Sequence, residues 1–507
     1  MSARLAGLVA VGAVLAGCAV GPSYQQPAPV APAQRVGGTG TDGRTRGFFD
    51  SLATARAADS SAASSSASEN STSAKPAADP APLAVDSMAD VSWLNLFRDT
   101  TLVGLVETAV RENRDVRAAM ARIREFRANV GLARSDLFPS VSANAIASRN
   151  RVAIGSFPAT TYNVLRTTAD LAWELDFWGR TRRGIEAARA DLDAQDASRR
   201  AVLLSLVSDV AGGYLSLLEL DQERAIAQRT LDARQAILDL ARRRFQQGVI
   251  SELDVRQFEA QVAVPAAALA QAERARAVAE HRLSVLLGAT PRSIPRGPSL
   301  ADAVAALQVP DSLPGTLVGR RPDVEQAERA FAAATARIGV AQAARLPTVS
   351  ITGSYGTQGV NTSSLFTSNG QIYQIQGGIS LPLFTGGRVS NEIEVARARA
   401  EQARVQYEKT VLVALQEAGD ALAGVRSARD EAAAQQTQAQ ALRRAVALAE
   451  RRYRSGVASY VEVLEAQRSL FDAELGLSRA QLQQLSAAVQ LYRALGGSWS
   501  TPNGGRR

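Results

Sequence analysis

Two hydrophobic periodicities alternate along the chain. From Leu102 to Val130, apolar residues recur every three or four positions, which predicts an amphipathic helix. This helix is expected to end before Pro139, because proline cannot donate a backbone hydrogen bond. The period then changes to two, as in a β-hairpin, and a much longer helical pattern follows with a returning helix behind it. The same series of patterns then occurs a second time.

Each predicted hairpin has one apolar and one polar face. Apolar and polar residues alternate over 141–148 and 165–177, and again over 349–355 and 373–383. A loop is predicted over 149–161. Strands of about 9 to 14 residues are long enough to cross a bilayer at a tilt. The alternation alone fits a soluble antiparallel sheet with one hydrated face equally well.

Other features favour a membrane barrel with a hydrated lumen. The N-terminus carries a lipid-attachment signal, described below, and aromatic residues lie near the strand ends, as in membrane barrels; these are Trp173, Trp178, Tyr355 and Tyr373. Four strands are too few to close a barrel around water, and open sheet edges are not tolerated in lipid. The chain is therefore expected to oligomerise in order to close the barrel.

Two very long helices are predicted, at about 180–246 and 388–454. At 1.5 Å per residue, roughly 67 residues span about 100 Å. Apolar positions with alternating spacings of three and four run from Leu203 to Phe245, and the same stripe returns 208 residues later. A stripe held for about six heptads is a coiled-coil seam. One stripe would usually mean a bundle core; two, each beside a hairpin, predict a helical tube that continues the barrel.

Two similar turns are predicted to end these helices, with the sequences RRFQQGVISELDV and RRYRSGVASYVEV. Gly248 and Gly456 supply the turns. Ser251 and Ser459 are the expected N-caps of the returning helices.

The returning helices are expected to run to Leu287 and Leu495, with a kink at Pro265 in the first.

The two turn sequences begin at Arg243 and Arg451, an offset of 208 residues. Four further pairs of short motifs keep this offset without a gap, so the chain is a tandem duplication of one unit. The linker between the copies is expected to pack outside the tube. The predicted organisation is a signal segment 1–17, a tether 18–91, a first repeat 92–290, a linker 291–319, a second repeat 320–497 and a disordered tail 498–507.

The N-terminal segment predicts export and lipid attachment. An apolar run from Leu5 to Leu15 is followed by Ala-Gly-Cys, which ends at Cys18, the only cysteine of the chain. This resembles a bacterial lipobox, which implies cleavage before Cys18 and a covalent lipid on that residue. Ala19 stands where an aspartate would suggest retention in the inner membrane. The alternative is an ordinary signal peptide, with Cys18 incidental.

The tether is rich in Pro, Ala and Ser, so most of it is expected to be disordered. After the signal segment no predicted helix contains a window of about 20 residues free of charge, and no further membrane helix is predicted.

Composition argues against nucleic-acid binding and against catalysis. The net charge is +8, but the arginines are scattered among acidic residues on helices, which favours a solvated surface over a phosphate-binding patch. His281 is the only histidine, so no second histidine can complete a metal site or a catalytic triad with it. It is expected to be a surface or packing residue. The chain is therefore predicted to be no enzyme and to need no cofactor beyond the lipid on Cys18.

Several motifs resemble the TolC-like outer membrane factor family, in its lipoprotein branch. They are Cys18–Pro22 with Tyr24 and Pro27, Trp93–Asp99, Gly319–Val324, Ala344–Pro347, Pro382–Phe384 with Gly386–Arg388, and the two turns. The resemblance implies a homotrimer whose four strands per chain form a twelve-stranded β-barrel in outer-membrane lipid. A long periplasmic α-helical coiled-coil barrel would continue it. The implied function is the passive exit duct of a tripartite efflux system, with a periplasmic adaptor (membrane fusion protein) and an inner-membrane efflux transporter as partners.

The resemblance also implies roles for residues of the two turns. They would form the periplasmic tip, which is closed at rest and opens when the adaptor docks; the residues are Gly248, Ser251, Leu253 and Asp254 in the first turn, and Tyr453, Gly456 and Ser459 in the second. Inward-facing acidic rings fall on Glu462 and Glu465, where a trimer would repeat each carboxylate three times and favour cations. The alternative is a solvated helix face.

The chain departs from some family members at Ala458, where they have an arginine, so a salt link from that position cannot lock the tip. A different class of function also fits the helices: a periplasmic coiled-coil structural lipoprotein or adaptor without a pore. Conductance in a planar bilayer separates the two.

Overall fold

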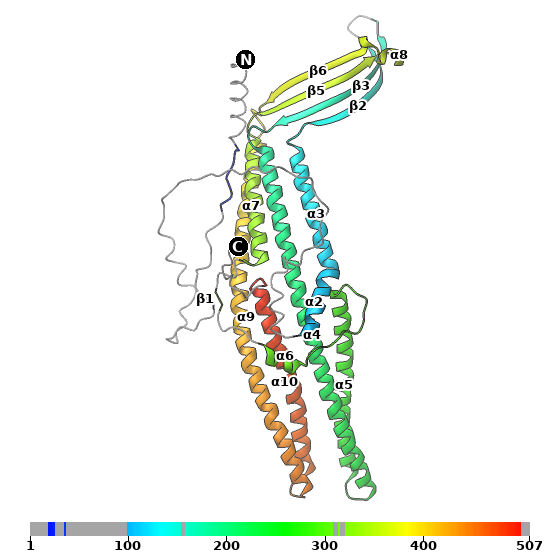
Figure 1. The fold of residues 1–507 in the computed structure, drawn as a ribbon, viewed down its shortest axis with the longest axis vertical. Coiled ribbons are helices and arrows are strands. Elements are labelled where there is room, and N and C mark those ends of the chain that lie inside the picture. Colours follow the sequence, from blue (N-terminus) through cyan, green and yellow to red (C-terminus); the bar gives the residue numbers. More distant parts are fainter. Residues whose placement is uncertain are drawn as a thin grey trace, which may run out of the picture.

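The computed structural model describes residues 19–25, 35–36, 99–153, 158–307, 313–314 and 320–497. It is a long rod of helices from one end of which a four-stranded sheet extends at an angle (Figure 1). The predicted signal segment, Cys18, most of the tether and the tail lie outside the described residues.

The two repeats contain the same series of elements. The first consists of α3 (Arg114–Ser135), β2 (Ser140–Val152), β3 (Thr160–Leu175), α4 (Arg180–Gln246) and α5 (Glu252–Leu286). The second consists of α7 (Pro322–Ala343), β5 (Thr348–Gly359), β6 (Gln371–Ser380), α9 (Arg388–Arg454) and α10 (Tyr460–Ala494). The four helix and strand pairs α3/α7, β2/β5, α4/α9 and α5/α10 each start 208 residues apart. The duplication predicted from the sequence is therefore confirmed element by element.

The prediction of one continuous helix from Leu102 to Val130 was wrong. The structure has α2 (Thr100–Glu112) and α3, separated at Asn113. The Asn113 side chain accepts hydrogen bonds from the backbone N–H groups of Asp115 and Val116, so it caps α3. Its Nδ2 also donates to the carbonyl of Leu286 at 2.9 Å, which ties the break to the end of α5. The Asn-Arg-Asp sequence at the break carries the capping signal.

The sheet is antiparallel with strand order β2-β3-β5-β6. The strands extend further than predicted, because β2 reaches Val152 and β3 already begins at Thr160, inside the predicted loop. The second hairpin has a longer connection, which contains α8 (Thr362–Leu365) and a 3₁₀ turn, η5 (Ser368–Gly370). β6 ends at Ser380, before Leu381 and Leu383, which were predicted to belong to it.

The two long helices are confirmed, and each has 67 residues. All predicted seam positions of α9 are buried or half-buried, and in α4 only Phe245 is exposed. α5 and α10 each have 35 residues, and α5 continues as a helix through the buried Pro265. The kink at Pro265 stays a prediction.

Among the described helices, α4 alone is long and apolar enough to cross a membrane by length and composition, and half of its apolar window is buried. Its buried residues Leu206, Val210 and Leu217 belong to the main core. The apolar window of α4 is thus explained by packing within the rod.

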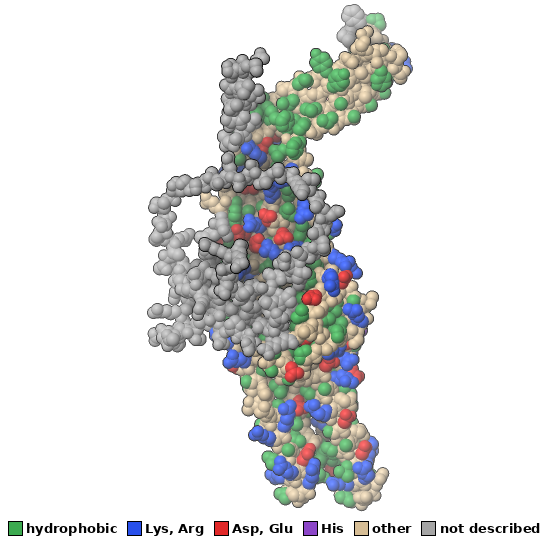
Figure 2. All heavy atoms as spheres, viewed as in Figure 1, with side chains coloured by type: hydrophobic (Ala, Val, Ile, Leu, Met, Phe, Trp, Pro, Cys, Tyr) green, Lys and Arg blue, Asp and Glu red, His purple; other side chains and the backbone are tan. Residues whose placement is uncertain are grey.

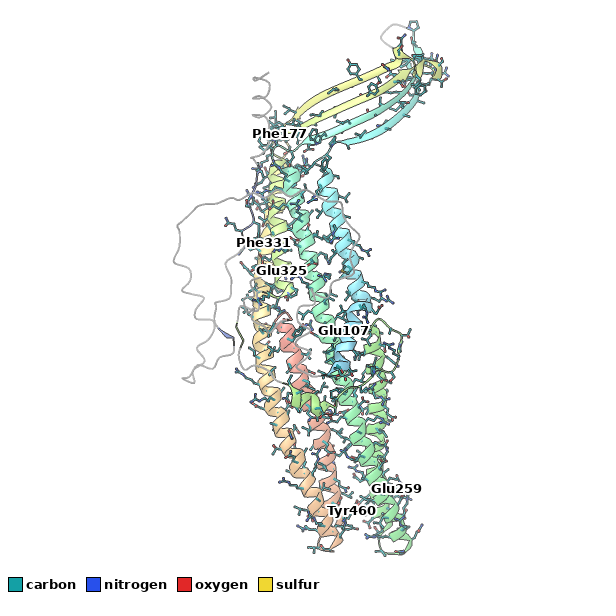
Figure 3. All side chains as sticks on the ribbon, in the orientation of Figure 1. Glu107, Phe177, Glu259, Glu325, Phe331 and Tyr460 are labelled. Carbon is teal, nitrogen blue, oxygen red and sulfur yellow. The ribbon has the colours of Figure 1, made fainter. Side chains whose placement is uncertain are left out.

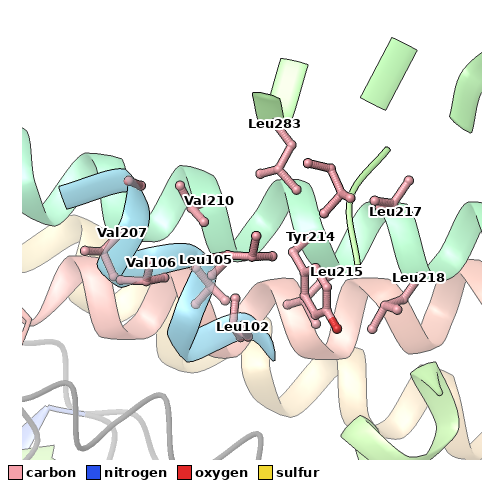
Figure 4. Close-up of a cluster of buried hydrophobic side chains, with 14 of the residues drawn as sticks. Leu102, Leu105, Val106, Val207, Val210, Tyr214, Leu215, Leu217, Leu218 and Leu283 are labelled. Atoms are coloured by element: carbon pink, nitrogen blue, oxygen red, sulfur yellow. The ribbon is translucent and has the colours of Figure 1, made fainter. Parts of the chain in front are cut away.

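The main core lies midway along the rod, where α2 meets α4, α5 and α10 (Figure 1). Figure 4 shows its buried side chains. Tyr214 is fully buried there; its hydroxyl donates to Asp99 at 2.7 Å and accepts from the backbone N–H of Gly297 at 2.8 Å. The linker contributes to this core through Ile294 and through Leu300 of the short helix α6 (Leu300–Ala306). The linker was expected to pack on the outside of the tube. It also contributes buried side chains to the main core.

Candidate functional site

The two faces of the sheet differ in chemistry over all four strands. Strand pairing places Ala143, Ala169, Tyr355 and Tyr373 in one cross-strand row. The neighbouring row on the opposite face consists of Ser142, Asp170, Ser354 and Gln374. The alternation predicted for each strand separately therefore adds up to one apolar face and one polar face.

The apolar face is exposed in the isolated chain. Tyr373, Ile375 and Ile379 have 81%, 82% and 76% of their surface exposed. An apolar surface of this extent on an extended sheet needs an apolar environment or a partner. On the polar face, Asn144 donates to Asp170 at 2.6 Å and Thr168 donates to the same carboxylate at 3.1 Å.

The sheet has two open edges. Within the described residues, β2 pairs only with β3 and β6 only with β5. The outer N–H and C=O groups of both edge strands are consequently available to another chain. A closed barrel can form only if β2 of one copy pairs with β6 of the next.

Two indole rings mark the junction between the sheet and the helices. Trp173 Nε1 donates to the carbonyl of Leu137 at 3.0 Å, and Trp178 Nε1 donates to the carbonyl of Pro347 at 2.7 Å. Both tryptophans were predicted to lie near strand ends. Amphipathic rings of this kind are typical of the boundary between lipid and water.

Residues 19–25 lie along α7 and the start of α4. The Val20 N–H donates to the carbonyl of Trp178 at 3.0 Å, and Arg183 Nη2 donates to the carbonyl of Gly21 at 3.1 Å. Gly21 packs so closely on Gly339 that a Cβ at Gly21 would lie 2.4 Å from the Gly339 Cα. Tyr24 donates to Glu328 at 3.1 Å, and its ring meets that of Phe331 edge to face. Figure 3 shows the place of Phe331 on α7. Ala19 thereby lies beside Gly179, at the junction.

The two turns at the opposite end of the rod have the same backbone. Gly248 and Gly456 have φ values of +71° and +74°, in the left-handed region that glycine adopts without strain. In each turn the glycine N–H and the following valine N–H bond back to carbonyls of the last helical turn. The predicted glycine turns are confirmed, and both are Schellman caps.

The helix starts after these turns differ. Ser251 caps α5 in a capping box, with its backbone N–H and hydroxyl both donating to Asp254 at 2.9 and 2.8 Å. These bonds hold the pKa of the Asp254 carboxyl below its usual value. Ser459 occupies the N-cap position of α10 but makes no side-chain cap bond. The corresponding carboxylate, Glu462, lies 3.6 Å from Arg452 instead, so the prediction that Ser459 acts as a cap was wrong for its side chain.

Aromatic and basic side chains join the two helical hairpins near their tips. Arg244 Nη1 of α4 donates to the hydroxyl of Tyr453 of α9 at 2.7 Å. The ring of Tyr460 lies 4.6 Å from that of Phe258 and 5.1 Å from that of Tyr453, between centroids. A cleft of about 530 Å³ separates the hairpins beside these contacts. Burial raises the pKa of the Tyr460 hydroxyl above its usual value.

The remaining predicted tip residues are exposed. Leu253 has 66% of its surface exposed, and Val461, at the same place in the second turn, has 58%. Glu462 and Glu465 are exposed on one face of α10, three residues apart. One chain alone contains one carboxylate of each predicted ring, so the rings stay predictions.

The sequence did not single out Arg244, Phe258 or Tyr460, although all three make the contacts between the hairpins. Arg244 lies inside the repeated turn sequence, but its counterpart Arg452 lies near Glu462 rather than near a tyrosine. The repetition of the sequence therefore did not predict the contact of Arg244 with Tyr453. The structure also shows no group of three or more His, Cys, Asp or Glu side chains placed to hold a metal ion, as far as the described residues extend.

Comparison with known proteins gives consistent results. The sequence model of outer membrane efflux proteins matches residues 105–289 and again residues 313–497. The toluene efflux pump outer membrane protein TtgC of Pseudomonas putida is 34% identical over 435 residues, which cover 85% of this chain and 90% of that protein.

Two solved structures share the fold. The outer-membrane channel OprN has a TM-score of 0.73 and 32% identity, over 81% of this chain and 93% of its own. The open state of the Neisseria gonorrhoeae MtrE outer membrane channel has a TM-score of 0.71 and 30% identity, over 79% of this chain and 89% of its own.

Proposed function

The chain belongs to the outer membrane efflux protein family, as the outer-membrane channel of an efflux pump, and from that premise we propose how its parts work. The observation that carries the proposal is the continuity of a two-faced sheet with helices of 67 residues. Such helices are about 100 Å long at 1.5 Å per residue. A duct needs the sheet to cross the membrane and the long helices to extend into the periplasm.

Three copies close the sheet into a twelve-stranded barrel. The open edges of β2 and β6 support this, because neither edge can remain unpaired in lipid. The apolar row containing Tyr355 and Tyr373 then faces lipid, and the row containing Asp170 and Gln374 lines a hydrated lumen. A soluble sheet with one wet face does not account for side chains as exposed as Ile375.

A covalent lipid on Cys18 anchors each copy to the outer membrane. The position of Ala19 beside Gly179, where the sheet meets the helices, supports this. The indoles of Trp173 and Trp178 mark the same level. A lipid attached one residue before Ala19 would thus start at the membrane boundary, with no need for a long spacer.

The helical tips form the periplasmic entrance. Contacts such as Arg244 to Tyr453 hold the two hairpins of one copy together, and docking of a periplasmic adaptor loosens them. The exposed Leu253 and Val461 give the adaptor an apolar contact on each turn. Rings of Glu462 and Glu465 draw cations to the entrance.

The duct is passive, and an inner-membrane efflux transporter selects what enters it. Relatives bear names that refer to toluene, solvents and antibiotics. We expect this channel to carry small molecules of that range. It needs no catalytic group for this role.

The test is single-channel conductance of the purified trimer in a planar bilayer. We expect a low conductance that rises severalfold in Arg244→Ala combined with Tyr453→Phe. Arg256→Ala is the matched control, because within the described chain Arg256 bonds only to Glu252 and Glu259 of its own helix. A trimer that conducts neither as wild type nor after the tip substitutions would refute the channel.

A further inference from the structure

The outer half of the barrel carries arginine but no acid. Three charged side chains lie in residues 140–169, which cover β2 and most of β3: Arg149, Arg151 and Arg166. Residues 346–387, which contain β5 and β6, have no charged side chain. Asp170, the first acid of β3, pairs with Ser142 near the helical end of the sheet. The charged side chains of β2, β3, β5 and β6 at the far end of the sheet are therefore all basic, and the face shown in Figure 2 carries no acidic side chain there.

Two of these arginines lie on the apolar face. β2 pairs with β3 in one unbroken register from Ser140 to Val152, so alternate residues keep to the same side. Arg149 and Arg151 share the side of Val141 and Ala143, and they pair with Asn163 and Thr161. The third, Arg166, pairs with Ile146 on the polar side. Arg149 and Arg151 thus point outward, where the barrel meets the membrane.

Their height matches the outer boundary of the lipid. Arg149 and Arg151 follow Val141 by eight and ten residues. At about 3.3 Å per residue and a tilt near 40°, Arg149 and Arg151 lie roughly 20 and 25 Å from Val141 along the membrane normal. The apolar band of such barrels is about 25 Å tall. The two guanidinium groups therefore reach the level of the lipid headgroups.

Within the part of the chain that the structure describes, neither guanidinium is neutralised by a carboxylate. Among the described residues, no acidic side chain forms an ion pair with Arg149 or Arg151. The adjoining segment 153–159 contains no acid either. Both residues are exposed. A guanidinium beside lipid and without a carboxylate is well suited to a phosphate, which it can bind through two parallel hydrogen bonds.

We propose that Arg149 and Arg151 form a binding site for the phosphorylated headgroup of an outer-leaflet lipid. The proposal rests on the membrane barrel of the proposed function, because only in that assembly does the outward face of β2 meet lipid. Three copies place three such pairs around the outer rim. The site fixes the height of the barrel in the membrane and binds the lipid around it.

The test measures binding of purified bisphosphorylated lipid A to the full-length trimer in detergent, by native mass spectrometry. Each basic side chain near an anionic lipid surface contributes about fivefold in affinity. We expect Arg149→Gln and Arg151→Gln each to weaken binding about fivefold. Arg166→Gln removes the same charge from the polar face of the same sheet, and is expected to leave binding unchanged. Arg149→Lys with Arg151→Lys should retain only part of the affinity, because lysine keeps the charge but cannot make the two parallel hydrogen bonds.

Two further probes separate the sources of phosphate. Lipid A without its phosphates should bind the wild type as weakly as the glutamine variants bind the intact lipid, and inorganic phosphate alone should not compete at millimolar concentration. Equal losses in all three glutamine variants, or equal binding of both lipids, would overturn the proposal. Planar-bilayer conductance, measured on the same samples, identifies which idea fails: a conducting trimer without phosphate preference refutes only the lipid site.

Discussion

The long helices of the two repeats have the same lengths and different buried residues. α4 and α9 each have 67 residues, yet Leu206, Tyr214 and Leu217 of α4 correspond to Ala414, Leu422 and Val425 of α9. The first set is buried in the main core, together with α2 and the linker. The duplication therefore fixed the spacing of the elements, while the packing of each copy developed separately.

The difference gives the halves different mechanical roles. The bulky residues of the main core lie mostly on α2 and α4, and only the C-terminal part of α10 from the second repeat joins them, so we expect the first hairpin to resist displacement. Below that core, the buried residues of α9 are mainly alanines such as Ala428, Ala432 and Ala439. Small side chains bury little area, so polar contacts carry more of the attachment of the second hairpin. We expect the second hairpin to move more easily when the entrance opens.

The largest expected difference between the repeats comes from their cores. Leu217→Ala should destabilise the chain by about 3 kcal/mol, because Leu217 is fully buried and the lost side chain leaves a cavity. Val425→Ala, at the same position of the second repeat, should cost about 1 kcal/mol, since Val425 is half-buried. The temperature at which the trimer dissociates on a gel measures both. Similar losses would show that the repeats are equally packed.

A second difference is electrostatic and depends on pH. Glu219 of α4 is buried, and burial together with the nearby Glu223 raises its pKa to about 7. The second repeat has Ser427 at this position. Because the folded pKa exceeds the unfolded value, the folded chain binds the proton more tightly. The stabilisation is present below the unfolded pKa and is lost as the pH rises through about 7.

Glu219→Gln should therefore remove this dependence. We expect the wild type to lose roughly 2 kcal/mol per chain between pH 5 and pH 8 through this group, and the variant to lose much less. Glu431→Gln is the control, because Glu431 is the exposed counterpart of Glu223 in the second repeat. Thermal dissociation of the trimer at both pH values decides the matter, and parallel curves for wild type and Glu219→Gln would contradict the assignment.

A third difference lies in the polar link between the hairpins. Glu474 of α10 is nearly buried and accepts from Arg229 of α4 at 2.8 Å and from Arg443 of α9 at 2.9 Å. Its counterpart in α5 is Ala266. Glu474→Gln should cost about 1 kcal/mol, because both arginines are more than half exposed and can return to water.

The same variant should also raise the open probability of single channels, because the link joins the second hairpin to the first. Glu450→Gln is the control, since the hydrogen bonds of Glu450 to described residues, from Arg454 and Gln467, stay within the second hairpin. An unchanged open probability in Glu474→Gln would mean that other contacts, such as Arg244 to Tyr453, hold the hairpins together without this link.

The sequence predicted what depends on local pattern. Periodicity and the offset of 208 residues located the hairpins and long helices, because side-chain spacing reports directly on strand and helix faces. It did not predict the bond between Arg244 and Tyr453, which joins residues far apart in the chain. It also mispredicted the Ser459 cap. Glu462 lies near Arg452 and forms an ion pair with it instead of a capping box with Ser459, and the sequence alone does not show this distance.

The smallest expected difference concerns the helix caps at the tips. Ser251→Ala removes the capping box of α5 and should cost about 1 kcal/mol of local stability. Ser459→Ala should cost only a few tenths, since the Ser459 side chain makes no cap bond. A loss of 1 kcal/mol is about fivefold in the opening equilibrium. Hydrogen exchange of the first-turn amides should therefore accelerate about fivefold in α5 and less than twofold in α10.

The same hydrogen-exchange measurement at low pH distinguishes loss of the cap from a general loss of stability at the tip. The pKa of Asp254 is lowered by its bonds from Ser251, so the cap stabilises α5 above the unfolded pKa of an aspartate and weakens as the pH falls through the lowered value. Acidification should therefore bring the exchange of wild-type α5 towards that of Ser251→Ala, after correction for the intrinsic exchange rate. The α10 amides should show no such convergence between wild type and Ser459→Ala. If both turns respond alike, the asymmetry of the caps has no part in how the two hairpins differ.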